Sequence, residues 1–449
     1  MNNPVASDSS STQDLRPMNL YRIALVLCIA LFGNTLLSQT VNYDFEGTGA
    51  LTGWVRNDGL PLTVGPGASG AGALAVVVNE AGSGVRAYHT VPFDPTKAYR
   101  YSAWTQSSDT ELSATMRLAW VDFSTGMTIY TDTYYMPCGL NGWKATGVHP
   151  HRLPAGDFSS NPNAQFCIVL EAGGNASGTV WLDDVRITRS DPANSAFLWV
   201  NVMLGGAYTP NSGTMSNNLR NAGLIPQTEP YTALGYPPVG GGSEQAPPAW
   251  WGVSTLDGPV DWVRIELRSA VDPAVIVATR HGLVSSIGHV TEVDGCSAIG
   301  FNVPAGNYYV AARHRNHLGV MTSAPVAVSA PIAIPWTGYS GVNFTSGSTA
   351  TWGTDAQKVG DTIYNYRVLW PGDVTRNGAV KYTGTGNDRD PILVAVGSTT
   401  PNNTVANVYS SNDVNLDGQT KYTGPSNDRD LILQQLNGSP NTVRIGQLP

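Results

Sequence analysis

The sequence is poor in charge, since Asp, Glu, Lys and Arg make up only 13% of its 449 residues. Long helices favour Ala, Leu, Glu and Lys, and this chain has few of the charged members of that set. The 25 basic residues are outnumbered by 33 acidic ones, which excludes an overall positive field for nucleic acid or anionic lipid. The mild acidity, with Asp in clusters, points instead towards divalent cations.

Glycine and proline are abundant, at 49 and 30 residues. They favour many short strands joined by turns, and the length allows about three domains of roughly 100–200 residues. We therefore predict a mostly β protein: a jelly-roll sandwich, then an immunoglobulin-like or transthyretin-like sandwich, then a small loop–helix duplication that binds calcium.

The longest apolar run lies near the N-terminus and is too short to span a bilayer. It covers residues 23–32, follows Arg22, and is followed by small and polar residues at 38–40. This is the pattern of an export signal, so we expect residues 1–40 to be a signal peptide and the protein to be secreted, extracellular or at the cell surface. An uncleaved anchor is the alternative.

Cysteine is scarce, and three cysteines remain after the signal: Cys138, Cys167 and Cys296. Their spacings do not make a zinc site. Cys138 and Cys167 fall in one predicted domain, so they are the candidate disulfide in an oxidising compartment.

Residues 41–190 alternate like strands and are interrupted by Gly, Asn, Asp and Ser turns, which predicts a two-sheet sandwich. The segments at its ends, Asn42-Tyr-Asp-Phe-Glu-Gly47 and Gly178-Thr-Val-Trp-Leu-Asp-Asp-Val-Arg-Ile187, resemble those of carbohydrate-binding modules of families four and nine. The resemblance implies a galactose-binding-like jelly roll and a glycan ligand. It also implies a structural calcium shared by Glu46 and Asp184, with a surface turn as the alternative.

Aromatic residues in this domain are the natural platforms for sugars, because the CH groups of a sugar ring stack on aromatic faces. The candidates are Trp143, which lies in a predicted loop, Trp104 and Tyr130. For strand residues, a place in the core is the competing interpretation.

Residues 196–329 form a second strand-rich region, predicted to be an immunoglobulin-like β-sandwich. In residues 260–268 the apolar residues Val263, Ile265 and Leu267 alternate with charged ones. Residues 330–370 have low hydrophobic periodicity and are predicted to be a connector.

The C-terminal residues 371–449 contain a duplication in which each matched position recurs 40 residues later. Each copy begins like an EF-hand loop, with oxygen-bearing side chains at positions one, three and five and Gly at position six. Such alternate side chains converge on one cation, and calcium takes six to eight oxygens. The candidate ligands are Asp373, Thr375 and Asn377 in the first copy and Asp413, Asn415 and Asp417 in the second.

The second half of each loop departs from an EF-hand, because Gly384 or Gly424 occupies position twelve. We predict a loop lengthened by about four residues and closed by Asp388 or Asp428, just before a short apolar helix. The alternative is that the Asn-Asp-Arg-Asp motif there caps the helix without metal.

The paired loop–helix units resemble dockerin modules, in the variant that ends many secreted proteins of Bacteroidetes-type bacteria. Three upstream segments extend this resemblance over residues 196–449: residues 223–231, residues 260–264 and Arg313-His-Arg-Asn-His-Leu-Gly-Val-Met-Thr322. It implies Ca²⁺ and a surface-associated or adhesin-like setting, with a cohesin-like or cell-envelope protein as a possible partner.

No catalytic motif was found. His314 and His317 are three residues apart in a predicted strand, where their side chains would point to opposite faces, so we expect a structural role. The leading hypothesis is a secreted, non-catalytic glycan-binding or adhesin-type protein. The alternatives are a scaffold that docks to a cohesin-like partner or the cell envelope, and an accessory protein of a polysaccharide-degrading system.

Overall fold

A computed structural model describes residues 39–449 of the chain except residues 69, 95, 124–126, 132–134, 137–142, 152–160, 162, 249, 251–257, 296 and 331–340. The predicted signal segment therefore lies almost wholly outside the described residues. Gln39–Pro449 forms one compact unit. Strands far outnumber helices in it, which confirms the mostly β prediction. No helix in the described part of the chain is long and apolar enough to cross a membrane.

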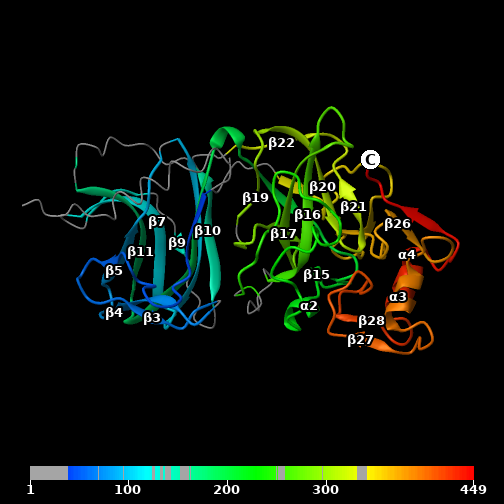
Figure 1. The fold of residues 1–449 in the computed structure, drawn as a ribbon, viewed down its shortest axis with the longest axis horizontal. Coiled ribbons are helices and arrows are strands. Elements are labelled where there is room, and N and C mark those ends of the chain that lie inside the picture. The colour runs from blue at the N-terminus through cyan, green and yellow to red at the C-terminus, as the bar shows by residue number, and fades with distance from the viewer. Residues whose placement is uncertain are drawn as a thin grey trace, which may run out of the picture. The chain divides into compact units, whose positions relative to one another are not determined.

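The N-terminal region is a sandwich of two antiparallel six-stranded sheets (Figure 1). The first sheet has the order β10 (Lys144–His151), β6 (Ala98–Ser107), β12 (Gly178–Ser190), β4 (Ala73–Val78) and β3 (Thr63–Gly65), with β1 (Gln39–Tyr43) also paired to β12. The second has the order β2 (Trp54–Arg56), β5 (Gly84–Thr90), β11 (Ala164–Gly174), β7 (Leu112–Asp122) and β8 (Met127–Thr131), with β9 (Tyr135–Met136) also paired to β7. The predicted opening and closing strands of the domain are thus neighbours.

Alternation builds the core of this sandwich. In β7, Leu112, Ala114, Met116 and Leu118 are all buried, while the residues between them are more exposed at the start of the strand. Since successive side chains of a strand point to opposite faces, these four face the other sheet. They join the apolar cluster between the two sheets.

The second region is one nine-stranded sheet that curls back on itself. Its main order is β19 (Ile299–Phe301), β13 (Ala196–Asn201), β18 (His289–Thr291), β17 (Ile276–Ser285), β16 (Pro259–Ser269), β20 (Gly306–His314) and β21 (His317–Met321). β22 (Val326–Val328) pairs with β20, and the next residue, Ser329, exchanges backbone hydrogen bonds with Phe197 of β13. We call this region the curled sheet.

Part of the predicted connector belongs to this curled sheet. β23 (Gly341–Asn343) pairs in parallel with β13, and β24 (Gln357–Val359) forms a hairpin with β25 (Arg367–Leu369). The remaining short elements of the region are β14 (Tyr208–Thr209), β15 (Thr214–Met215), the 3-10 turn η1 (Pro192–Asn194) and α2 (Asn218–Asn221).

The charged face of β16 is buried rather than solvated. Arg264, Glu266 and Arg268 are each at most 2% exposed, and both arginines form ion pairs with Glu266. The two guanidinium groups also donate to backbone carbonyls of Tyr236, Pro237, Pro273 and Pro449. Backbone from other segments, including the C-terminus, therefore covers this face.

The duplicated segment, called the tail below, contains the order strand, helix, strand twice (Figure 1). Its elements are β26 (Ala379–Lys381), α3 (Arg389–Val396), β27 (Thr404–Ala406), β28 (Gln419–Lys421), α4 (Asp428–Gln435) and β29 (Val443–Ile445). Its small apolar core includes Leu318 from β21 of the curled sheet. In return, Leu416 of the tail is buried in the main core of the curled sheet.

Candidate metal-binding loops

The second loop of the tail is organised around two buried carboxylates. The two oxygens of Asp413 accept hydrogen bonds from the backbone amides of Asp417 (3.0 Å) and Gly418 (2.9 Å). The oxygens of Asp428 accept from the amides of Val414 (2.6 Å) and Lys421 (2.8 Å). Asp428 is therefore hydrogen-bonded to the residue that follows Asp413, so the last predicted ligand lies beside the first.

Burial and mutual repulsion disfavour the charged forms of these two carboxyls. Burial, as the largest cause, raises the pKa of Asp413 to about 7, and burial together with the nearby Asp413 raises the pKa of Asp428 to about 8. Both are 0% exposed. Two such carboxyls are stable side by side only if a cation binds between them or if protonation removes their charge.

The first loop repeats this arrangement. Asp373 accepts from the amides of Asn377 (3.0 Å) and Gly378 (3.1 Å), and Asp388 accepts from the amides of Thr375 (2.9 Å) and Lys381 (2.8 Å). Burial raises the pKa of Asp373 to about 7, with Asp388 as the next cause, and burial raises the pKa of Asp388 to about 6. The two copies therefore fold alike despite their different third and fifth positions.

The other predicted ligands lie in the loops but bond within them. Asn415 donates to the carbonyl of Ser426 and to Asp417, and Asn377 donates to the carbonyl of Gly386. The Thr375 hydroxyl donates to Asp388. These side chains therefore also brace the loops from within.

In the Asn-Asp-Arg-Asp motif, one residue caps the helix and another closes the loop. The Asn427 side chain accepts from the Asp430 amide at 2.8 Å, as a helix cap does. Arg429 lies over the ring of Tyr422 at 4.9 Å, and Asp430 accepts from Asn427 and Arg429. Asp428 faces the loop instead, so helix capping does not account for it.

The donor set fits calcium. In each loop the buried carboxylates are hard oxygen donors with an Asn side chain nearby, and the first loop adds the Thr375 hydroxyl; calcium prefers such oxygen ligands. None of Asp373, Asp388, Asp413 and Asp428 forms an ion pair with another residue that the structure describes.

The predicted calcium pair in the sandwich is arranged differently from the expectation. Glu46 accepts from the Gly72 amide at 2.9 Å, and Asp183 accepts from the Ala68 amide at 2.8 Å. Asp183 is 0% exposed, whereas Asp184 is half-buried with a φ of 46°. A shift in the register of β12 against β6 begins at Asp183 and disturbs the alternation there, so the buried carboxylate that faces the same loop as Glu46 is Asp183.

The structure contradicts one predicted sugar platform. Trp104 is 2% exposed and packs edge-on against Trp250, with ring centroids 5.0 Å apart, so its face is not available to a ligand. Trp143 is half-buried against the same apolar cluster. The side chain of Tyr130 lies outside the described residues. A hollow of about 340 Å³ elsewhere on the sandwich is lined by residues 51, 54–56 and 59–62, a site that the sequence did not suggest.

Cys167 is a buried thiol on β11, and burial raises its pKa to about 12. Cys138 and Cys296 are outside the part of the chain that the structure describes. The Cys138–Cys167 disulfide therefore stays a prediction.

The two histidines of β20 and β21 correct the expectation of opposite faces. The chain turns between them, so His314 and His317 pair across a hairpin, with their Nδ1 atoms 2.9 Å apart. His314 also contacts Asp261 at 3.1 Å, and the Gly206 amide donates to His317 at 2.9 Å. Burial lowers the pKa of both histidines, and each stays neutral and hydrogen-bonded.

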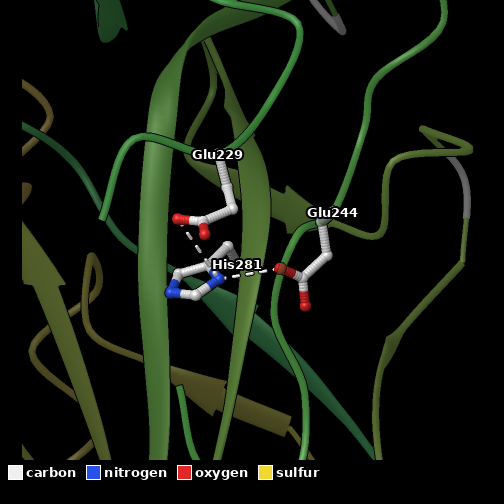
Figure 2. Close-up of side chains that lie close together, drawn as sticks. All are labelled: Glu229, Glu244 and His281. Carbon is white, nitrogen blue, oxygen red and sulfur yellow. Dashed lines mark hydrogen bonds and ion pairs between the residues drawn. The ribbon is translucent and has the colours of Figure 1, made fainter. Parts of the chain in front are cut away.

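A second cluster, which the sequence did not suggest, consists of Glu229, Glu244 and His281 in the curled sheet (Figure 2). The His281 Nδ1 lies 2.8 Å from Glu244 and 3.6 Å from Glu229. The Glu229 carboxylate already accepts hydrogen bonds from the amides of Tyr231 and Thr232. The buried Nε2 of His281 has no hydrogen-bond partner. A metal on Nδ1 would leave Nε2–H without an acceptor, whereas metal-bound histidines almost always donate that hydrogen. The cluster is better explained as a hydrogen-bonded brace between loops and β17.

No protein-family model matches the chain, and no curated protein matches it. Solved structures give partial likenesses. One is the C-terminal family 22 carbohydrate-binding module of Clostridium thermocellum Xyn10B (19% identity, 33% of this chain and 91% of that chain, TM-score 0.26). Others are the CBM22-1 xylan-binding domain of Paenibacillus barcinonensis Xyn10C (14%, 35% and 99%, 0.27) and TmCBM61 in complex with β-1,4-galactotriose (16%, 33% and 99%, 0.24). At these TM-scores the likenesses add nothing to what the sheets themselves show.

Proposed function

We propose that this chain is a secreted, non-catalytic glycan-binding protein of the adhesin type whose tail is stabilised by calcium. The observation that carries the calcium part is the pairing of two buried carboxylates in each loop, Asp373 with Asp388 and Asp413 with Asp428. Calcium supplies positive charge to each pair. The amides that donate to the carboxylates hold them in position.

The glycan part rests on the two-sheet sandwich and on the family resemblance of its first and last strands. The sandwich has a core of its own, built by side chains of both sheets. A cohesin-like or envelope partner for the tail, and an accessory role in polysaccharide degradation, are the competing proposals.

Calcium should raise the melting temperature of the full chain relative to chelator. At a free calcium concentration one hundred times the dissociation constant, each occupied site adds about 2.7 kcal/mol to the free energy of unfolding. Differential scanning calorimetry in calcium and in chelator measures this.

Two double variants distinguish calcium binding from helix capping as the role of these carboxylates. Asp388→Asn with Asp428→Asn should abolish the calcium response. Asp390→Asn with Asp430→Asn should keep it, because it alters only the carboxylates that accept from the capping Asn387 and Asn427. Equal melting temperatures of the unmodified chain in both solutions would show that the loops do not bind calcium.

The glycan proposal is tested with the full chain on a polysaccharide array, with xylan and β-1,4-galactan among the probes. We expect retention on at least one polysaccharide, and we expect the Asp388→Asn, Asp428→Asn variant to retain it, because the sandwich has its own core. Absence of binding to every polysaccharide on the array would favour the scaffold alternative, which predicts calcium-dependent capture of a protein.

A further inference from the structure

The two loops of the tail differ in how they contact the curled sheet, although they are alike inside. Position four of the second loop is Leu416, which is 1% exposed and packs in the main core of the curled sheet. The equivalent residue of the first loop is Arg376, which is exposed. The duplication therefore has one docked copy and one copy that faces solvent at this position.

Asn316, at the turn between β20 and β21, holds the start of the second loop. Its side-chain amide donates to the carbonyl of Asp413 at 2.6 Å and to that of Ser411 at 3.2 Å. Its own Oδ1 accepts from His317, which fixes the orientation of the amide. A side chain of the curled sheet thus positions the residue that supplies the first carboxylate.

The segment before the second loop is anchored as well. Arg315 donates to the carbonyl of Ser410 and lies over the ring of Tyr409 at 4.3 Å, and the Tyr409 hydroxyl donates to Asp261 at 2.5 Å. The segment that leads into the first loop is held by backbone groups, with the Leu318 amide donating to the Trp370 carbonyl and the Gly372 amide donating to the Asn316 carbonyl. Neither contact uses the Asn316 side chain.

We propose that Asn316 and Leu416 are positioning residues for the second calcium loop, so that its calcium affinity depends on these two side chains while that of the first loop does not. The inference rests on the calcium binding proposed above. Docking holds Asp413 in place before the cation arrives, and a site ordered in advance binds more tightly. By linkage, calcium in the second loop strengthens docking of the tail to the same extent.

The test measures each loop separately in the full chain by calorimetric titration of calcium. In Asp388→Asn only the second loop keeps both carboxylates, so the titration measures calcium binding by that loop. In Asp428→Asn it measures calcium binding by the first loop. Adding Asn316→Ala should weaken the second loop about tenfold, which is the effect of losing one or two hydrogen bonds, and should change the first loop by less than about twofold. Leu416→Ala should act in the same way. The matched Arg376→Ala removes only an exposed hydrogen bond to Ser411 at 3.3 Å and should change either loop by less than about twofold.

Amide hydrogen exchange in calcium gives a second readout without loop knock-outs. In Asn316→Ala, the amides of Val414 and Lys421, which donate to Asp428, should exchange faster. The amides of Thr375 and Lys381, which donate to Asp388 in the first loop, should not. Weakening of both loops alike, or of neither, overturns the positioning role while calcium binding stands. Absence of calcium binding in both backgrounds overturns the proposed function itself.

Discussion

Replacing Asp261 by Asn should lower the free energy of unfolding by about 3–5 kcal/mol, the usual cost of removing one partner of a buried ion pair. Asp261 is 0% exposed and accepts from Arg315 (3.1 Å), from the Tyr409 hydroxyl (2.5 Å) and from His314 (3.1 Å). Arg315 is itself 1% exposed, so the substitution leaves a buried guanidinium without its counter-charge.

The direction of the hydrogen bonds explains why Asn cannot replace Asp261. The Gly206 amide donates to Nε2 of His317, so the proton of this neutral ring is on Nδ1, which faces Nδ1 of His314. His314 must then carry its proton on Nε2 and donate it to Asp261. The groups that contact the Asp261 carboxylate all donate hydrogen bonds to it. The side-chain NH2 group of an Asn at position 261 would therefore face another donor.

Chemical denaturation of the full chain in calcium measures the effect. The control is Asp355→Asn, which removes an ion pair with Arg444 in which the carboxylate is 48% exposed, and which should cost less than about 1 kcal/mol. A loss of stability no larger than in this control would mean that Asp261 is not the centre of the contact between curled sheet and tail.

The sequence was informative where a repeated pattern fixes geometry. The duplication predicted two equivalent loops closed by Asp388 and Asp428, and the structure places each beside the first carboxylate of its loop. Alternation likewise predicted the strands of the sandwich and its mostly β class. These features are local, or they recur, so they can be read from spacing.

Long-range contacts were missed because no local pattern encodes them. The alternation in β16 placed Arg264 and Glu266 on the face opposite the apolar residues, but it gave no sign that distant backbone covers this face. His314 and His317 looked like strand residues because the turn at positions 315–316 carries neither Gly nor Pro. Leu416, within a polar loop, was the one local sign that the second copy docks onto another part of the chain.

Calcium-free protein should lose stability as the pH rises from 6.5 to about 8.5. Burial raises the pKa of Asp413 and Asp373 to about 7 and that of Asp428 to about 8, far above the value of an unfolded Asp. In this window the folded chain holds more protons than the unfolded chain, so the free energy of unfolding falls with rising pH. The expected fall is on the order of 3 kcal/mol, at about 1.4 kcal/mol per pKa unit and group.

The window is chosen so that the histidines do not contribute. Burial lowers the pKa of His314 and His317, so they stay neutral in the folded chain while unfolded histidines gain protons below about 6.5. Below that pH their effect has the opposite sign, because stability is lost as the pH falls. Above it, the loop carboxyls dominate the slope.

Denaturation curves at several pH values, in chelator and in saturating calcium, separate the loops from the rest of the protein. Calcium should flatten the slope, since the bound cation keeps the carboxylates ionised in the folded state. Asp428→Asn should reduce the slope in chelator, and Asp430→Asn, two residues along the same helix with a lowered pKa, should not. A calcium-free chain whose stability is constant or rises between pH 6.5 and 8.5 would show that these carboxyls are not held together as the loops require.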